Sequence, residues 1–273
     1  AIAEAMDQSD VVILGEEHDD PLAHRLERTF LEMAAKRAKA RPIALSLEMF
    51  ERDVQLVMDE YLTGLIREKD FLAAARPWKN YEPDYRPLVE LARTEGLAVI
   101  AANAPGRYVS RVGRLGAASL AALPFEARAY LAPLPYAAAS KAYAEKFRAR
   151  IGPMAANPDH HTHHPPLAAD LLEAQVLRDA TMAHAIARHL EKQKSGLVLH
   201  VNGRFHSDER LGVPEHLARY LPEARVVVVT LATTETGQPE GGAATDFVIV
   251  KAAPSGTPPA PARTSPPAPA DRR

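Results

Sequence analysis

The chain has 273 residues, of which 47% are hydrophobic, so it is long enough to bury one large core. Its 33 Lys and Arg face 35 Asp and Glu, and the formal charge of -2 lacks the basic excess of a nucleic-acid-binding surface, so we expect no nucleic-acid partner. The absence of cysteine excludes disulfides, thiolate metal sites and cysteine nucleophiles. No stretch reaches the roughly 18 consecutive apolar residues of a membrane span.

The first hundred residues alternate short apolar runs with helical patterns. Residues 11–14 are wholly apolar and stop at Gly15, as a buried parallel strand does. Pro21 then suits a first helical turn, and apolar residues recur at helical spacing, namely Leu22, Leu26, Phe30, Met33 and Ala34. By the same signals we predict strands at 11–14, 43–47 and 97–102, and helices at 1–6, 21–40, 54–61 and 84–95.

The middle of the chain contains a region for which no strand is predicted. Residues 105–166 are rich in Ala, Arg and Pro, and predict helices near 105–113, 117–122 and 138–150. We interpret 105–166 as a helical insertion or lid. The alternating pattern then returns, with helices at 167–192 and 214–220 and strands at 196–201, 225–231 and 247–250.

These elements predict an α/β fold with a mainly parallel sheet flanked by helices and joined by right-handed crossovers. The α/β core comprises residues 1–104 and 167–251. Residues 252–273 contain seven Pro among Ala, Ser and Thr, and we expect a disordered tail there.

Polar residues that follow strands are the first candidates for a site, because ligands of open parallel sheets bind beyond the carboxyl ends of the strands. Gly15-Glu16-Glu17-His18 comes directly after the first strand. Two carboxylates beside an imidazole offer metal ligands or an acid–base pair. The alternative is that Glu16 and His18 only cap the next helix.

Glu48 and His206 occupy comparable positions. Glu48 interrupts an apolar run at the end of the second strand, where a charge must be paired or face a cleft. Arg52 is its nearest cationic neighbour along the chain, and a structural Glu48–Arg52 pair is the alternative. Gly203-Arg-Phe-His206 repeats the Gly-x-x-His spacing found at His18, and its imidazole could ligate a metal, orient a water or shuttle a proton.

Further polar residues could support this site. Gln175 and Asp179 fall on the apolar stripe of helix 167–192, where they either hydrogen-bond the loops that carry His206 or Glu48 or are satisfied locally. His161 and His164 belong to a histidine-rich, Pro-flanked segment that either binds a transition metal or is a solvated loop.

Five segments carry a family resemblance across about residues 8 to 231. They are Ile13-Leu-Gly-Glu-Glu-His-Asp-Asp20, Leu47-Glu-Met-Phe50, Ala101-Ala-Asn-Ala-Pro-Gly-Arg-Tyr108, Glu173-Ala-Gln-Val-Leu-Arg-Asp-Ala-Thr-Met-Ala183 and Asn202-Gly-Arg-Phe-His206. In these the chain resembles the ChaN-like haem-binding, iron-regulated lipoproteins of the Tiki, TraB and erythromycin-esterase superfamily. Typical members read Gly-Asn-Gly-His in the last motif, so the turn before His206 is expected to be longer here.

The resemblance implies a haem-binding protein of haem or iron acquisition, with iron-linked expression and haem held by tyrosine at a homodimer interface. It also implies a lipoprotein in the periplasm or outer membrane, so we expect contact with a membrane only through a lipid anchor, of which this sequence carries no signal. Phenolate oxygen suits ferric haem. Tyr136 and Tyr143 are our candidates for the ligand, from their place in the predicted lid.

A metal-dependent hydrolase, either an esterase or a peptidase, is the alternative function. Its catalytic residues would be Glu16, Glu17, His18, Glu48 and His206. Arg52, Gln175 and Asp179 would surround them, and a divalent metal would bind His18 and His206. A third possibility is a non-catalytic interaction domain that retains the site as a relic.

Overall fold

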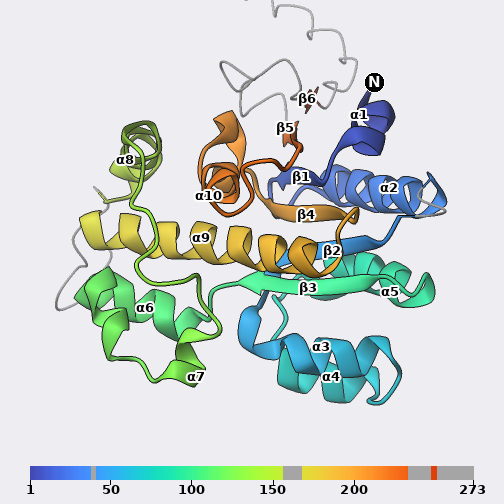
Figure 1. The fold of residues 1–273 in the computed structure, drawn as a ribbon, viewed down its shortest axis with the longest axis horizontal. Helices are drawn as coiled ribbons and strands as arrows, with labels where there is room; N and C mark the ends of the chain where they lie inside the picture. The colour runs from blue at the N-terminus through green and yellow to red at the C-terminus, as the bar shows by residue number, and fades with distance from the viewer. Residues whose placement is uncertain (38–40, 156–167, 233–246, 251–273) are drawn as a thin grey trace, which may run out of the picture.

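Six apolar runs form one parallel sheet in a computed structural model that describes residues 1–37, 41–155, 168–232 and 247–250. The strand order is β3-β2-β4-β1-β5-β6, and every neighbouring pair is parallel (Figure 1). The strands are β1 (Val11–Glu16), β2 (Ile43–Glu51), β3 (Ala98–Asn103), β4 (Leu197–Gly203), β5 (Val226–Ala232) and β6 (Phe247–Val250). The predicted α/β class with a mainly parallel sheet is confirmed.

Both faces of the sheet are covered, because side chains along a strand alternate between them. Val12 and Leu14 of β1 enter a core completed by α1 (Ile2–Gln8), α2 (Pro21–Arg37), α3 (Gln55–Leu62), α4 (Glu68–Ala75) and α5 (Arg86–Thr94). Val11 and Ile13 enter the opposite core, which α9 (Ala168–Lys192) and α10 (Val213–Tyr220) complete. This double burial explains why the strands appear in the sequence as continuous apolar runs.

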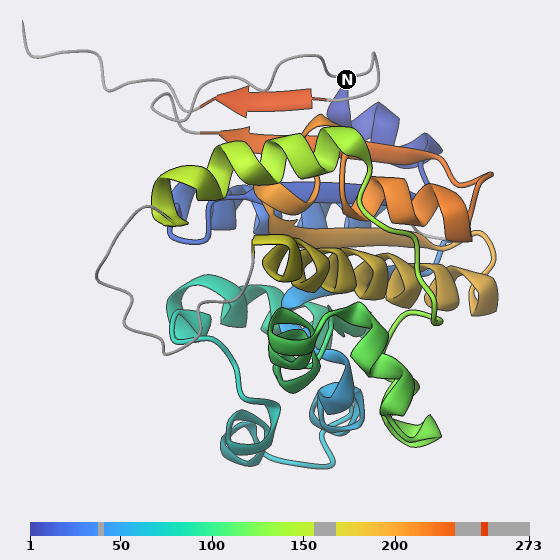
Figure 2. The same cartoon turned by 90° about the vertical axis from the view of Figure 1, so that its left-hand side faces the viewer.

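Helices and turns connect β3 to α9. They are α6 (Gly106–Leu115), a 3-10 turn at Ala117–Ala122, α7 (Phe125–Arg128) and α8 (Lys141–Ala155). This segment has a small core of its own, in which Val112, Leu120 and Leu131 pack with Leu177 of α9. Both α6 and α8 lie on the side of the sheet toward which β3 points (Figures 1 and 2).

The structure differs from the prediction in several elements. β1 continues through Gly15 to Glu16 and β2 continues to Glu51, so both strands carry their acidic residues inside the sheet. The helix α4 and the π-helical turn at Tyr81–Tyr85 were not predicted. The predicted tail, residues 252–273, lies outside the described residues. No helix in the described ranges is long and apolar enough to cross a membrane.

The buried face of α2 is also rotated relative to the prediction. Its buried residues include Ala23, His24 and Glu27, whereas Leu22 and Leu26 are half-buried. The apolar pattern alone was misleading because the polar pair His24 and Glu27 turns inward to meet Glu16. This rotation places the imidazole of His24 and the carboxyl group of Glu27 beside Glu16, at the end of β1.

Candidate functional site

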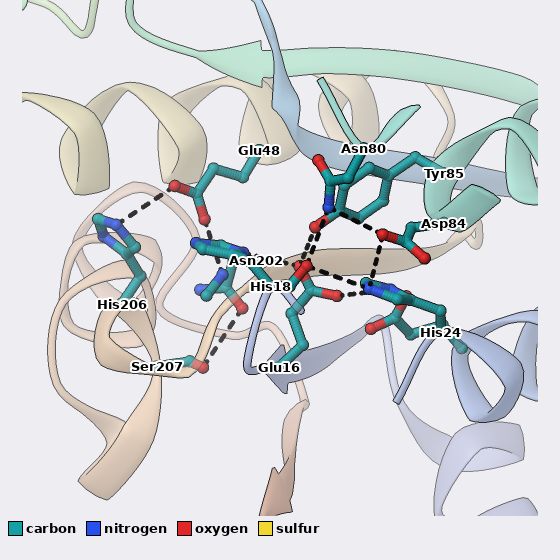
Figure 3. Close-up of polar contacts among 12 residues, drawn as sticks. Glu16, His18, His24, Glu48, Asn80, Asp84, Tyr85, Asn202, His206 and Ser207 are labelled. Atoms are coloured by element: carbon teal, nitrogen blue, oxygen red, sulfur yellow. Dashed lines mark hydrogen bonds and ion pairs between the residues drawn. The ribbon is translucent and has the colours of Figure 1, made fainter. Parts of the chain in front are cut away.

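The polar residues of the site gather where β1, β2 and β4 end. These three strands are neighbours, with β4 between the other two. Glu16 of β1 is in register with Gly203 of β4, and Glu48 comes from β2. Figure 3 shows His206 on one side of this edge, His24 on the other, and His18 between them. The sequence therefore predicted the strand ends correctly as a meeting point of His18, Glu48 and His206.

The His206 cluster, defined as Glu48, Asp179, His206 and Tyr143, surrounds one buried imidazole with two carboxylates. His206 Nδ1 lies 2.5 Å from Asp179 Oδ1, and His206 Nε2 lies 3.4 Å from Glu48 Oε1. The other oxygens are also engaged, because Gly203 N donates to Glu48 Oε2 at 2.7 Å and the Tyr143 hydroxyl donates to Asp179 Oδ2. Every carboxylate oxygen of this cluster has a partner.

This arrangement keeps His206 charged. Burial lowers the pKa of His206, but the charges of Glu48 and Asp179 outweigh it and raise the pKa to about 10. Burial raises the pKa of Glu48, but His206, His18 and the Gly203 amide bring it down to about 2. At neutral pH the cluster is therefore a buried ion pair with an imidazolium at its centre.

The Glu16 cluster, defined as Glu16, His24, Glu27 and Tyr85, is the second buried group. His24 Nδ1 lies 3.1 Å from Glu16 Oε2 and 3.2 Å from Glu27 Oε2. The Tyr85 hydroxyl donates to Glu16 Oε1 at 2.6 Å. In contrast to the His206 cluster, Glu16 Oε2 and Glu27 Oε1 accept no hydrogen bond from the described residues.

The titration of this cluster follows from crowding two carboxyl groups together. Burial and the charge of Glu16 raise the pKa of Glu27 well above its usual value. Burial also raises the pKa of Glu16, but the hydrogen bond from His18 and the contact with His24 outweigh it and lower the pKa to about 2. Burial lowers the pKa of His24, whereas both carboxylates raise it, to about 10.

His18 connects the two clusters and is the imidazole that solvent reaches. Its Nδ1 lies 2.8 Å from Glu16 Oε1, and its side chain is 44% exposed. The imidazole ring of His18 contacts the backbone of Gly203. A Cβ atom added to Gly203 would lie 2.7 Å from the nearest atoms of that ring. Trp78 packs edge-on against the His18 ring, with the two ring centroids 4.9 Å apart. Burial lowers the pKa of His18, but the hydrogen bond to Glu16 and the charge of Glu48 leave it raised.

Other candidates lie apart from this edge or are engaged elsewhere. The alternative Glu48–Arg52 pair is wrong, because Arg52 Nη1 donates to the Ala101 carbonyl at 3.0 Å and helps cover the outer edge of β3. Glu17 Oε1 lies 3.6 Å from Arg204 Nη1, so this carboxylate forms an ion pair with Arg204. Gln175 is half-buried on α9, one turn before Asp179. His161 and His164 lie outside the described residues.

Tyr136 and Tyr143, the predicted haem ligands, both have buried hydroxyls. The Tyr143 hydroxyl donates a hydrogen bond to Asp179 Oδ2. The Tyr136 hydroxyl has no hydrogen-bond partner in the described part of the chain. Burial raises the pKa of both phenols.

Sequence reasoning missed His24 and Glu27 as site residues. Both lie on the face of α2 that also carries Ala23, Phe30 and Ala34, so a signal was present. Two polar groups three residues apart on an apolar helix face require partners.

Comparison with known proteins gives one family and several similar folds. The family model described as haem-binding uptake, Tiki superfamily, ChaN matches residues 2–217. No curated protein matches the chain. Among solved structures, the chain is similar to ChaN of Campylobacter jejuni with cofacial heme, at 18% identity and a TM-score of 0.65, over 85% of this chain and 84% of that one.

Two further similar structures are more distant. The type III effector HopBA1 shares 12% identity at a TM-score of 0.45, over 90% of both chains. The erythromycin esterase EreC shares 12% identity at a TM-score of 0.46, over 85% of this chain and 72% of that one.

Proposed function

Because this chain belongs to the ChaN family of haem-binding uptake proteins in the Tiki superfamily, we propose that it binds haem and acts in haem or iron acquisition. The observation that carries the proposal is the family match, which extends over residues 2–217. The shared fold with ChaN of Campylobacter jejuni is consistent with it. Haem is the cargo in this proposal.

The tyrosines of the α6–α8 segment suit ferric haem chemically, since phenolate oxygen is an established ligand of that iron. The Tyr136 hydroxyl has no hydrogen-bond partner among the described residues. A bound iron would give its oxygen a partner. Burial and the charge of Glu173 raise the pKa of its phenol, so ferric iron would have to displace the proton. Tyr143 would first have to release Asp179.

Tyr130 is a third candidate that the structure adds. It is 37% exposed, just after α7, and Phe125 of that helix is 77% exposed. An exposed aromatic ring can pack on a porphyrin face, and Arg128 lies close in sequence for a propionate. Exposed apolar residues of this kind also suit contact with a second copy of the chain, as a haem-linked homodimer requires.

A hemin titration tests the proposal. We expect a saturable Soret shift with the native chain, and loss or displacement of that shift in whichever of Tyr130→Phe, Tyr136→Phe and Tyr143→Phe removes the ligand. Tyr108→Phe, in the same segment, is the matched control. A native spectrum equal to the sum of free hemin and protein would reject haem binding.

We further propose that the protein works outside the cytoplasm, in the periplasm or outer membrane as a lipoprotein. The uptake role of the family supports this location. Fractionation of cells that express the native gene tests it, and recovery of the protein only with cytoplasmic markers would contradict it.

Hydrolysis is the second candidate function, and the observation that favours it is the buried Glu48–His206–Asp179 arrangement beside the exposed His18. His206 is charged at neutral pH, so it would act as an acid or stabilise negative charge, while His18 is placed to contact water. His18→Ala should lower ester turnover by about 10²–10⁴-fold if His18 is the acid–base group. Absence of ester or peptide turnover by the native chain would reject this function.

A further inference from the structure

The Glu16 cluster has more buried acceptors than donors. Glu16 and Glu27 are 1% and 0% exposed. One oxygen of each, Glu16 Oε2 and Glu27 Oε1, accepts no hydrogen bond from any residue that the structure describes. The donors that face this pair are His24 Nδ1, which carries at most one proton and faces both carboxyl groups, and any proton that Glu27 retains because its pKa is raised. A buried acceptor without a donor is costly, and a cation bound between the two carboxyl groups would supply the missing partner.

The other nitrogen of His24 shows which side of the ring holds the proton. His24 Nε2 lies 3.3 Å from the carbonyl oxygen of His18 and 3.7 Å from Asp84 Oδ2, and both of these groups are acceptors. In neutral imidazole these contacts keep the proton on Nε2 and leave the lone pair of Nδ1 directed at the two carboxylates. A backbone carbonyl on the far nitrogen is the usual support of a metal-ligating histidine.

The spacing of the three ligand atoms also suits a metal. One ligand atom from each of Glu16, His24 and Glu27 can be chosen so that all lie within 4.8 Å of one another. His24 Nδ1 lies 3.1 Å from Glu16 Oε2 and 3.2 Å from Glu27 Oε2. Metal bonds of about 2.1 Å place neighbouring ligand atoms about 3.0–3.4 Å apart in octahedral or tetrahedral geometry.

We propose that Glu16, His24 and Glu27 form a buried site for one divalent first-row transition cation. Two carboxylate oxygens and one imidazole nitrogen suit Mn²⁺, Fe²⁺ or Zn²⁺. The remaining oxygen of Glu16 is oriented by Tyr85 and His18, so the ligand is held before the cation arrives. The site is separate from the His206 cluster, and the proposal does not depend on haem binding.

Metal analysis of the native, haem-free chain tests the site. After treatment with a chelator and equilibration with Zn²⁺ or Mn²⁺, we expect about one cation per chain. Glu27→Gln should weaken binding by more than the roughly 10–100-fold typical of losing an outer contact. Glu32→Gln is the matched control, because it makes the same change on the outer face of α2, where Glu32 pairs with Arg28.

Two further variants separate the alternatives. His206→Gln should retain the cation, and so should a variant in which His160, His161, His163 and His164 are all replaced. No stoichiometric metal in the native chain would overturn the proposal. So would a cation that survives Glu27→Gln but is lost from either of these variants.

A diffraction measurement avoids any dependence on variants that fold poorly. Crystals of the native chain soaked in Zn²⁺ should give an anomalous difference peak between Glu16, His24 and Glu27. A peak beside His206 or at surface histidines, with none at the proposed site, would refute the assignment.

Discussion

The two buried clusters at the carboxyl edge of the sheet contain the same kinds of residue but distribute protons differently. In the His206 cluster the two ring nitrogens face different carboxylates, and each carboxylate oxygen has its own donor. In the Glu16 cluster a single ring nitrogen faces both carboxylates, and two oxygens have no donor in the described residues. The first cluster is complete as it stands, whereas the second offers two unpartnered oxygens to a cation.

This difference shows that composition does not decide what a polar cluster can do. An imidazole between two carboxylates bridges them, and removing any member leaves a buried charge without its partner. When an imidazole presents one nitrogen to two carboxyl groups, the two groups compete for a single proton donor. The direction of each ring, fixed by the backbone around it, therefore separates the two clusters.

The largest effect is expected when the complete cluster loses a carboxylate. Asp179→Ala removes the acceptor of both His206 and the Tyr143 hydroxyl, so the free energy of unfolding should fall by about 3–5 kcal/mol. Urea denaturation measures this. Gln175→Ala, one turn away on α9, should change stability by less than about 0.5 kcal/mol. Equal losses in the two variants would remove the special role of Asp179.

The same substitution in each cluster tests the comparison directly. Glu48→Gln should cost about 3 kcal/mol, because a charged His206 loses one of its two counter-charges. Glu27→Gln in metal-free protein should change stability by about 1 kcal/mol or less, since a neutral amide can donate to Glu16 and replaces a carboxyl whose pKa is raised. If the two variants were equally unstable in urea, the clusters would not differ as described.

The pH dependence of stability should also depend on His206. Its pKa is raised from 6.5 to about 10, so its contribution is complete below about pH 6.5 and is lost as the pH rises toward 10. Glu48, with its pKa lowered to about 2, contributes above about pH 4.5 and loses this as the pH falls. Unfolding free energies between pH 6.5 and 10 should therefore fall more steeply for the native chain than for His206→Gln, and parallel curves would contradict this.

The smallest effect is expected at the junction of the clusters. In Gly203→Ala the new Cβ would meet the ring of His18, which is half exposed and can turn aside. Stability should drop by about 1 kcal/mol or less, at the lower end of overpacking costs. The ring resonances of His18 should shift while those of His206 stay in place. A large shift at His206 would mean that the junction is rigid.

The sequence predicted the sheet and part of the site for a clear physical reason. Continuous apolar runs identify strands buried on both faces, and the carboxyl ends of parallel strands converge, so His18, Glu48 and His206 were correctly expected together. His24 and Glu27 were missed because the prediction counted only apolar residues toward the buried face of α2, and both lie beside Phe30 and Ala34 on that face. Ring direction cannot be inferred from residue spacing, because it depends on contacts such as His24 Nε2 with the His18 carbonyl.

The central claim is that the His206 cluster and the Glu16 cluster distribute their protons differently. Its most direct test is an NMR titration of the histidine ring protons in the chelator-treated native chain. We predict that His206 and His24 remain charged through neutral pH and titrate near pH 10, whereas His200, whose pKa burial lowers to about 4, stays neutral. Addition of Zn²⁺ should then displace the proton of His24 alone. Ordinary titration of His206 and His24 near pH 6.5, or an equal response of both rings to Zn²⁺, would contradict this account.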